Sequence, residues 1–275
     1  MFRQNLHAHS NYDDGRSTIR EMIEASMAEG LESVGISVHS PLPYDSGWGV
    51  YPDRLDEYVA EMHALTREYA GRIDVFTGIE WDILTDTDLS RFEYVIGSVH
   101  HMPFGDPAPC VDHCAQTTKE IIAYYGGDVN AAAEAYFAQY DAVAAQPEVD
   151  IVGHIDLLTK FDEQAGFFTG KSKRYTSAAL CAMEKLVRAG KIFEINTGAI
   201  SRGYRTTPYP DRALLHALRE MGGKVTISAD AHHASGVACA FDQAEALAKA
   251  CGFTSAQVLR RTEDGVRFVD TPFED

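Results

Sequence analysis

Segments typical of β-strands alternate with segments typical of α-helices along almost the whole chain, and this limits the fold more than any other feature. The strand-like segments are short runs rich in β-branched residues, and the segments between them carry apolar residues at helical spacing. Repeated strand-then-helix units favour a parallel sheet covered by helices. We predict seven strands, within residues 2–10, 34–38, 73–80, 92–100, 150–153, 192–196 and 225–230.

The predicted helices begin and end at residues that suit these positions. Thr18 and Glu21 have the Thr-x-x-Glu spacing of a capping box, and Gly30 is expected to end the helix that they start. A second helix is predicted from Leu55 to Tyr69. Further apolar stripes predict helices at residues 180–187, 214–221 and 243–250, with a short tail after the last of them.

Residues 103–147 interrupt this alternation. A proline-rich loop at residues 102–109 is followed by two predicted helices, of which the second is rich in alanine. An excursion of this length after a strand usually covers the mouth of an active site. We therefore expect a helical insertion after the fourth strand. Since the sequence contains no repeat and no linker, we expect residues 1–275 to form a single domain.

Histidine and acidic side chains stand at the ends of most predicted strands. His7 and His9 are two residues apart, so in a strand both imidazoles would point to the same face. The carboxyl ends of all strands meet at one mouth only in a barrel, whereas an open doubly wound sheet binds ligands near one switch point. Taken singly, each of these histidine and acidic residues is best interpreted as structural, but their recurrence at successive strand ends predicts a barrel with a metal site. Later strands contribute His39, Glu80, His100, His154, Asp230 and His232.

The composition excludes some functions and narrows the expected location. A formal net charge of -17 argues against a nucleic-acid-binding surface, which needs clustered Lys and Arg, and most simply indicates solubility. No apolar stretch could span a bilayer and the N-terminus lacks a secretory signal, so we expect a cytoplasmic protein with no membrane partner. The five cysteines are scattered, as in a reducing compartment, and we interpret Cys110 and Cys114 as structural.

The blocks around these residues resemble those of the PHP (polymerase and histidinol phosphatase) superfamily over nearly the whole chain. The resemblance begins with His7-Ala8-His9 and Tyr12-Asp13-Asp14-Gly15 and ends with Asp230-Ala231-His232. Three further blocks look like the histidinol-phosphatase branch: Gly97 to His100, Asp150 to Phe161 and Phe193 to Gly198. The resemblance implies an α/β fold, a distorted seven-stranded (β/α)7 barrel of the TIM-like PHP type, with a trinuclear metal centre.

The resemblance also implies a role for each side chain at the mouth. Glu80 would bridge two ions and, with Asp230 and His232, would take part in catalysis. Asp14 is preferred to Asp13 as a ligand because the family's Tyr-x-Asp-Gly variant places its acid directly before the glycine. The first ion would be held by His7, His9, Glu80 and Asp230, the second by Glu80, His100 and His154, and the third by His39, His232 and Asp14.

Imidazole and carboxylate ligands without thiolate suit zinc, iron or manganese, and the sequence does not choose among them. Such cations neutralise a phosphate ester and lower the pKa of a bound water, so that hydroxide can attack phosphorus. Phosphate oxygens outside the metal shell need Arg or Lys, for which the candidates are Arg202, Lys160 and Arg205. A solvated basic side chain is the alternative interpretation of each.

The resemblance predicts a phosphoric monoester hydrolase, a histidinol-phosphatase that acts on L-histidinol phosphate, a small phosphorylated substrate. A PHP phosphoesterase for a nucleotide or sugar phosphate would share every ligand and is the first alternative. A proofreading module of a DNA polymerase is opposed by the acidic balance and by the lack of a polymerase domain. An amidohydrolase would normally place a lysine on a central strand, and no predicted strand end offers one. The oligomeric state is left open.

Overall fold

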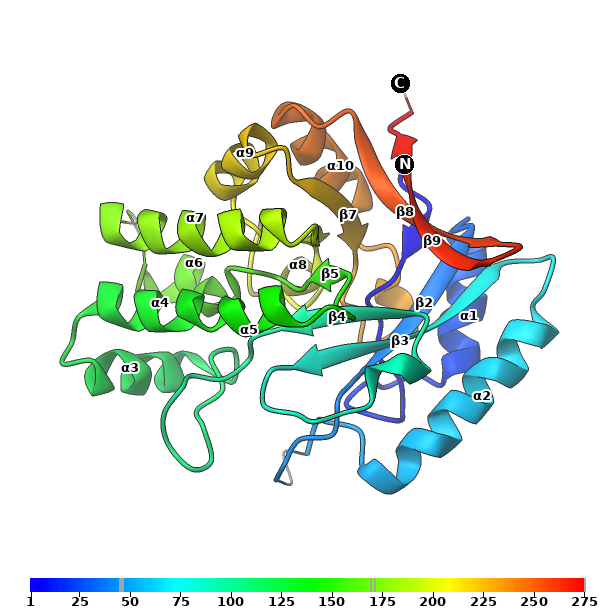
Figure 1. Cartoon of the computed structure of the whole chain (residues 1–275), viewed down its shortest axis with the longest axis horizontal. Helices are drawn as coiled ribbons and strands as arrows, with labels where there is room; N and C mark the ends of the chain where they lie inside the picture. Colours follow the sequence, from blue (N-terminus) through cyan, green and yellow to red (C-terminus); the bar gives the residue numbers. More distant parts are fainter. Residues whose placement is uncertain (45–46, 169, 171, 275) are drawn as a thin grey trace.

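The computed structural model describes residues 1–44, 47–168, 170 and 172–274. Seven parallel strands form one sheet in sequence order, with helices around it (Figure 1). This confirms the predicted seven-stranded barrel, although several strands are shorter than expected. The strands are β1 (Gln4–Asn5), β2 (Ser33–His39), β3 (Asp74–Asp82), β4 (Tyr94–Ser98), β5 (Ile151–Val152), β6 (Ile192–Asn196) and β7 (Lys224–Ser228).

The barrel nearly closes where the segments that follow β1 and β7 meet. Ala8 pairs with Ala231 in an isolated parallel bridge. The backbone N–H of His9 donates to the carbonyl of Ala231 at 2.9 Å, and the N–H of Ala231 donates to the carbonyl of His7 at 3.2 Å. The two ends of the sheet therefore join beside the residues predicted to bind metal.

The helices between the strands follow the apolar patterns of the sequence. The capping box is formed, because the Thr18 hydroxyl accepts from the backbone of Glu21 and the Glu21 carboxylate accepts from the backbone of Thr18. None of the helices in the described ranges is long and apolar enough to cross a membrane. The larger helices of this ring are α1 (Ile19–Ala28), α2 (Leu55–Glu68), α7 (Lys173–Arg188), α9 (Arg212–Glu220) and α10 (Phe241–Ala250). Shorter ones are η1 (Pro52–Arg54), η2 (Leu89–Arg91), η3 (Leu157–Thr159), α6 (Asp162–Ala165), α8 (Gly198–Ser201) and η4 (Ala234–Gly236).

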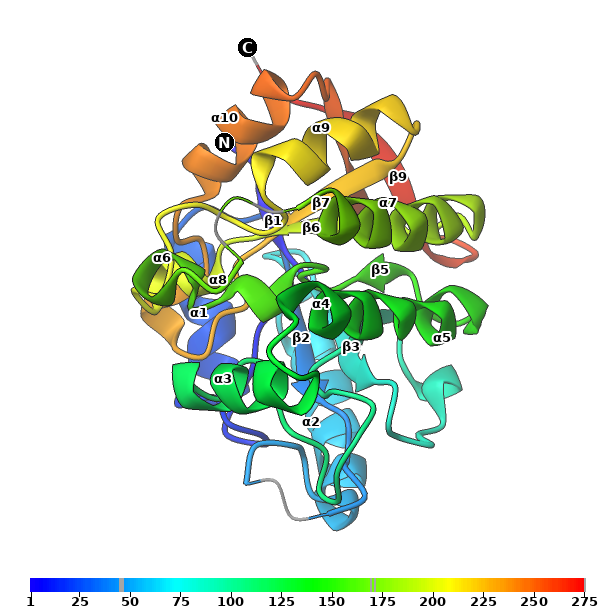
Figure 2. The same cartoon turned by 90° about the vertical axis from the view of Figure 1, so that its left-hand side faces the viewer.

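The insertion after β4 contains three helices, so the prediction of two was wrong. They are α3 (Ala115–Tyr124), α4 (Val129–Ala138) and α5 (Tyr140–Ala145), and Figure 2 shows them on the same side of the barrel as α7. The alanine-rich segment divides at Gln139, whose side-chain amide donates to the carbonyl of His101 at 2.9 Å. This hydrogen bond links the break between α4 and α5 to the loop after β4, and so holds the insertion against the barrel mouth.

The predicted short tail was also wrong, since residues after α10 form an antiparallel hairpin of β8 (Ser255–Thr262) and β9 (Gly265–Pro272). Leu259 is buried in a small apolar cluster with barrel residues that include Leu6 and Ile192. The Gln4 side chain holds β8 in place, because its amide nitrogen donates to Leu259 O at 2.9 Å and its oxygen accepts from Leu259 N at 2.8 Å. The hairpin thus packs against the amino ends of the strands, opposite the predicted site.

Candidate metal centre and active-site cavity

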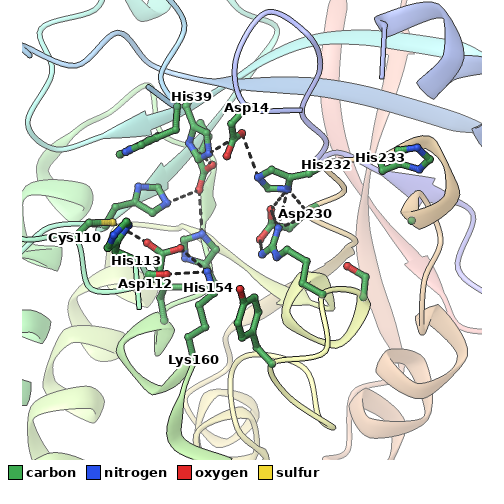
Figure 3. A pocket seen from close by; sticks show the side chains of 18 of the residues that line it. Asp14, His39, Cys110, Asp112, His113, His154, Lys160, Asp230, His232 and His233 are labelled. Carbon is green, nitrogen blue, oxygen red and sulfur yellow. Dashed lines mark hydrogen bonds and ion pairs between the residues drawn. The ribbon is translucent and has the colours of Figure 1, made fainter. Parts of the chain in front are cut away.

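A cavity of about 720 Å³ opens at the carboxyl ends of the barrel strands. Imidazoles and carboxylates from different strands converge in it (Figure 3). His39 ends β2, Glu80 lies in β3 and His100 follows β4, so the chain contributes one polar side chain after another as it passes round the barrel. The parallel strand order is what brings these distant residues to one mouth.

His7 and His9 reach the site from outside regular strand structure. The expected strand at residues 2–10 is β1, which covers only Gln4 and Asn5, and the next residues are held by the Ala8 bridge instead. Both imidazoles nevertheless approach the same carboxylate, with Nε2 of His7 3.1 Å and Nε2 of His9 3.6 Å from Oε2 of Glu80. The shared direction expected of a His-x-His pair is therefore produced by the seam of the barrel.

Glu80 lies between two sets of histidines and offers one oxygen to each. Its Oε2 is 2.9 Å from Nδ1 of His39 and close to the two N-terminal histidines. Its Oε1 is 3.2 Å from Nε2 of His100 and 3.0 Å from Nε2 of His154. The side chain is 1% exposed. A carboxylate with its oxygens divided in this way has the arrangement of a bridge between two cations.

Several atoms around Glu80 are buried without a hydrogen-bond partner among the described residues. They are Nε2 of His7, Nε2 of His9, Nδ1 of His39 and Oε2 of Glu80. Buried polar atoms normally have partners, so atoms that crowd together without hydrogen-bond geometry need another explanation. Lone pairs directed at a common point are what cation ligands present, and the donor set therefore fits a metal.

All nine predicted ligands fall into groups whose candidate ligand atoms lie within 4.8 Å of one another. Glu80 belongs to two groups and His9 to two, as expected for ions that lie side by side. The ligand roles themselves stay predictions. The groups are His7, His9 and Asp230; His7, Glu80 and His154; His39, Glu80 and His100; and His9, Asp14, His39 and His232.

The two adjacent aspartates after β1 take different positions. Oδ1 of Asp14 faces the cavity, 3.2 Å from Nε2 of His232 and 3.7 Å from Nε2 of His39. Oδ2 of Asp13 instead lies 2.7 Å from Nδ1 of His9 and accepts from the backbone of His39 at 2.9 Å. This placement agrees with the choice of Asp14 as the ligand, and it makes Asp13 the residue that orients His9.

Asp230 has a backbone conformation that ordinary residues rarely adopt. Its φ of 47° is in the left-handed region, where few non-glycine residues are found, although aspartate is more frequent there than most, and such residues cluster at active sites. Its Oδ1 lies 3.5 Å from Nε2 of His9, and its Oδ2 accepts from Nη2 of Arg202 at 2.9 Å. A Cβ on Gly198 would come within 2.7 Å of that carboxylate, so glycine leaves the space that the ion pair needs.

Glu194 and Asp82 are buried carboxylates that the sequence analysis missed. Oε2 of Glu194 lies 2.8 Å from Nδ1 of His7, and Oδ2 of Asp82 lies 3.1 Å from Nδ1 of His100. Each carboxylate therefore binds the nitrogen that faces away from the cavity, and such partners fix the ring orientation of metal-binding histidines. The signal was available for Asp82, which is two residues from Glu80 on the same strand and so on the same face.

The charges in this cluster stabilise one another. Burial alone would raise the pKa of Glu80, but His7, His39 and His100 hold it well below its ordinary value. Burial alone would lower the pKa of His9, but Asp13 and Asp230 raise it to about 10. Glu80 therefore stays ionised at neutral pH, and His9 holds a proton that a cation would displace.

The three basic candidates lie in different positions. Arg202 lines the cavity and binds Asp230, while its Nη1 lies 2.7 Å from Nδ1 of His232. Lys160 also lines the cavity, and its ammonium group is paired with Asp112 at 2.9 Å. Arg205 is not among the described residues that line the cavity; its Nη1 donates to the Thr159 hydroxyl at 2.7 Å. Of the two that line the cavity, Arg202 is the more exposed, at 26% against 10% for Lys160.

The fold and the site define an α/β barrel with a candidate metal centre at its mouth, and the sequence comparison gives the family. The PHP domain matches residues 5–198, and the chain belongs to this family, which confirms the resemblance seen in the sequence.

The chain is 26% identical over 283 residues to a probable histidinol-phosphatase of Schizosaccharomyces pombe, covering 94% of this chain and 90% of that one. It is 30% identical over 242 residues to a probable histidinol-phosphatase of Deinococcus radiodurans, covering 82% of this chain and 85% of that one. Its fold is similar to the crystal structure of histidinol phosphate phosphatase from Lactococcus lactis, in complex with zinc, L-histidinol and phosphate. That comparison has a TM-score of 0.67 and 20% identity, and covers 93% of this chain and 96% of the other.

Proposed function

We propose that this chain is a metal-dependent histidinol-phosphatase, which hydrolyses L-histidinol phosphate to L-histidinol and phosphate. The observation that carries the proposal is Glu80, whose two oxygens face two sets of histidines. The nitrogens that approach Oε2, from His7, His9 and His39, are buried without a hydrogen-bond partner among the described residues. The curated relatives named probable histidinol-phosphatase, one of them 30% identical, support this particular substrate.

The proposed cofactor is a trinuclear centre of zinc, iron or manganese held by the nine residues of the four groups above. When bound, such ions neutralise the phosphate ester, lower the pKa of a water molecule and stabilise the departing alkoxide. The ionised state of Glu80 and Asp230 suits them to this task, since the pKa of each is held well below its ordinary value against the effect of burial.

Arg202 is the proposed phosphate-binding residue. Its guanidinium group lines the cavity and is anchored through Asp230. Arginine binds phosphate oxygens through several parallel N–H donors, and an anchored side chain loses less conformational entropy when it does so. Lys160 is the second candidate, while Arg205 would need to move from its contact with Thr159 to reach an anion.

His232 is proposed to serve both as a ligand and as a group that positions substrate near Arg202. Burial lowers the pKa of its imidazole, and the neighbouring charge of His9 lowers it further. A neutral imidazole can hold a cation or accept a proton, which a protonated one cannot. Asp14 lies 3.2 Å from Nε2 of this ring and shares the third proposed ion with it.

We also propose that residues 1–275 act as one domain in the cytoplasm. The terminal hairpin supports the first point, because Leu259 completes an apolar cluster with residues of the barrel strands. The second is supported by the cysteines, all five of which are free thiols, the state expected in a reducing compartment.

The test is phosphate release by the purified protein reconstituted with Mn²⁺ or Zn²⁺. We expect L-histidinol phosphate to be hydrolysed far faster than nucleoside monophosphates or sugar phosphates. Glu80→Gln should abolish turnover and lower the metal content measured by atomic emission, whereas Glu57→Gln, at an exposed position of α2, should change neither. Faster release from a nucleotide would assign another substrate to the same site, and full activity of Glu80→Gln would remove Glu80 from the centre.

A further inference from the structure

Asp112 lines the cavity but belongs to none of the candidate metal groups. Among the described residues that line it, four are acidic: Asp14, Glu80, Asp112 and Asp230. Three of these belong to the metal groups, and Asp112 does not. It lies in the insertion after β4, across the cavity from Asp230 and His232 (Figure 3). An anion at this place is available for a positively charged part of the substrate.

The Asp112 side chain is held in a fixed position. The ammonium group of Lys160 donates to Oδ2 of Asp112 at 2.9 Å and to its backbone carbonyl at 3.0 Å, and the thiol of Cys110 donates to Oδ1 at 2.9 Å. A carboxylate can accept about four hydrogen bonds, so these contacts leave capacity for another donor. The Asp112 side chain is 24% exposed and that of Lys160 is 10% exposed, so the carboxylate is the more open partner of the pair.

The charge of Asp112 interacts with charged groups around the cavity, including the candidate ligand His100. Burial alone would raise the pKa of this carboxyl, but Lys160 and His100 hold it well below its ordinary value. Asp112 also contributes to the raised pKa of Arg202 on the other side of the cavity. A substrate that lies between Arg202 and Asp112 would thus have a cation at one end and an anion at the other.

We propose that Asp112 binds the ammonium group of the substrate and so selects amino-alcohol phosphates; this rests on the proposed function. In L-histidinol phosphate the ammonium-bearing carbon is bonded to the carbon that carries the ester oxygen. A phosphate bound at Arg202 and the ions therefore places the ammonium group inside the same cavity. A charge taken out of water needs a partner of opposite sign, and Asp112 is the described cavity carboxylate free of a ligand role.

A rival role for Asp112 is to hold Lys160 toward the phosphate. The two roles predict different substrate dependence. A residue that binds the ammonium group affects only substrates that carry it, whereas a residue that positions Lys160 affects every phosphate ester. L-histidinol phosphate and its des-amino analogue, imidazolepropanol phosphate, differ in this one group and separate the two cases.

The experiment compares both esters on wild type, Asp112→Asn and Lys160→Met. Wild type should prefer L-histidinol phosphate by roughly 30-fold or more in kcat/KM, the effect of removing one partner of a hydrogen-bonded charge pair. Asp112→Asn should lose most of this preference, with a change of less than about threefold on the analogue. Lys160→Met removes the ion pair, keeps the carboxylate and should retain the preference. Equal losses on both esters in Asp112→Asn, matched by Lys160→Met, would overturn the proposal.

A binding measurement without turnover gives a second readout. Calorimetric titration of L-histidinol into the metal-loaded protein should show binding that weakens roughly 30-fold in Asp112→Asn, while imidazolepropanol binds both proteins equally. If wild type hydrolyses the two esters equally well, no ammonium contact exists and the inference fails while the phosphatase assignment stands. If wild type hydrolyses neither ester but cleaves a nucleotide, the proposed function itself fails.

Discussion

Oε2 of Glu194 lies 2.8 Å from Nδ1 of His7, so a strand in the second half of the barrel orients a histidine at the start of the chain. Oε1 of the same carboxylate accepts from the backbone N–H of His154 at 2.6 Å. Glu194 thus fixes one candidate ligand by its side chain and another by its backbone. In both cases the imidazole keeps Nε2 directed at Glu80.

Glu194→Gln should weaken metal binding without unfolding the protein. The amide keeps the size of the side chain but loses its charge, and outer partners of metal-binding histidines typically contribute about 10–100-fold in affinity or activity. Metal affinity measured by competition with a chromophoric chelator should fall in this range, with a parallel loss of kcat/KM. Glu184→Gln, at an exposed position of α7, is the matched control. Unchanged metal affinity would mean that His7 does not depend on the Glu194 carboxylate for its orientation.

Arg202→Ala should raise KM and weaken inhibition by inorganic phosphate, with a smaller effect on kcat. The lost contact is a hydrogen bond between charged groups, which is worth about 1.5–3 kcal/mol, so KM should rise roughly tenfold or more. Steady-state kinetics with added phosphate measures both effects. Arg188→Ala, at an exposed position of α7, should leave them unaltered. A normal KM would return Arg202 to the role of a structural partner of Asp230.

Metal removal should lower the melting temperature more at alkaline pH than at acidic pH. In the metal-free protein the pKa of His9 is raised to about 10, so its protonated form contributes stability below its ordinary pKa of about 6.5. That contribution is lost as pH rises through the raised pKa. A cation must displace this proton, so metal stabilises the fold increasingly as pH increases.

The measurement is thermal melting with and without a chelator from about pH 6 to about pH 9. The carboxylates do not reverse this trend, since the pKa of Glu80 lies well below its ordinary value and the group stays ionised throughout the range. A difference in melting temperature that shrinks as pH rises would contradict the assignment of His9 to the centre.

Leu259→Ala should destabilise the protein and leave the metal centre intact. Leu259 is 1% exposed in the cluster at the amino ends of the strands, and removing a buried leucine side chain costs about 2–5 kcal/mol. Urea denaturation measures the loss, and the metal content of the folded protein should stay that of wild type. Val269→Ala, on the more exposed face of β9, should cost much less. Equal stability of the two variants would show that the hairpin does not support the barrel.

Local patterns in the sequence predict much of the fold. The capping box of Thr18 and Glu21, and the apolar stripes of the larger helices, depend on neighbouring residues and were predictable. The hairpin at residues 255–272 was not predicted, although exposed and half-buried side chains largely alternate along β9. Unlike most barrel strands, its strands carry no candidate metal ligand at their ends. The division of the insertion at Gln139 depends on a contact with His101, which is distant in sequence.

The site shows the same division between local and long-range information. The nine candidate ligands could be selected because imidazole and carboxylate recur after strands and match family blocks. The orienting role of Glu194 could not, since it depends on a contact across 187 positions of sequence. The two-residue β1 was also beyond sequence patterns, because Ala8 is held by Ala231 rather than by its own strand.

The seam between Ala8 and Ala231 has a consequence for how the protein assembles. His7 and His9 flank the first alanine and Asp230 precedes the second, so residues far apart in the sequence lie together only where the two edges of the sheet meet. A metal ion bound by His7, His9 and Asp230 would link the segment after the first strand to the segment after the last strand and so stabilise the closed barrel. Metal binding at this group would then require the closed barrel, and a chain with the barrel still open would lack this part of the metal centre.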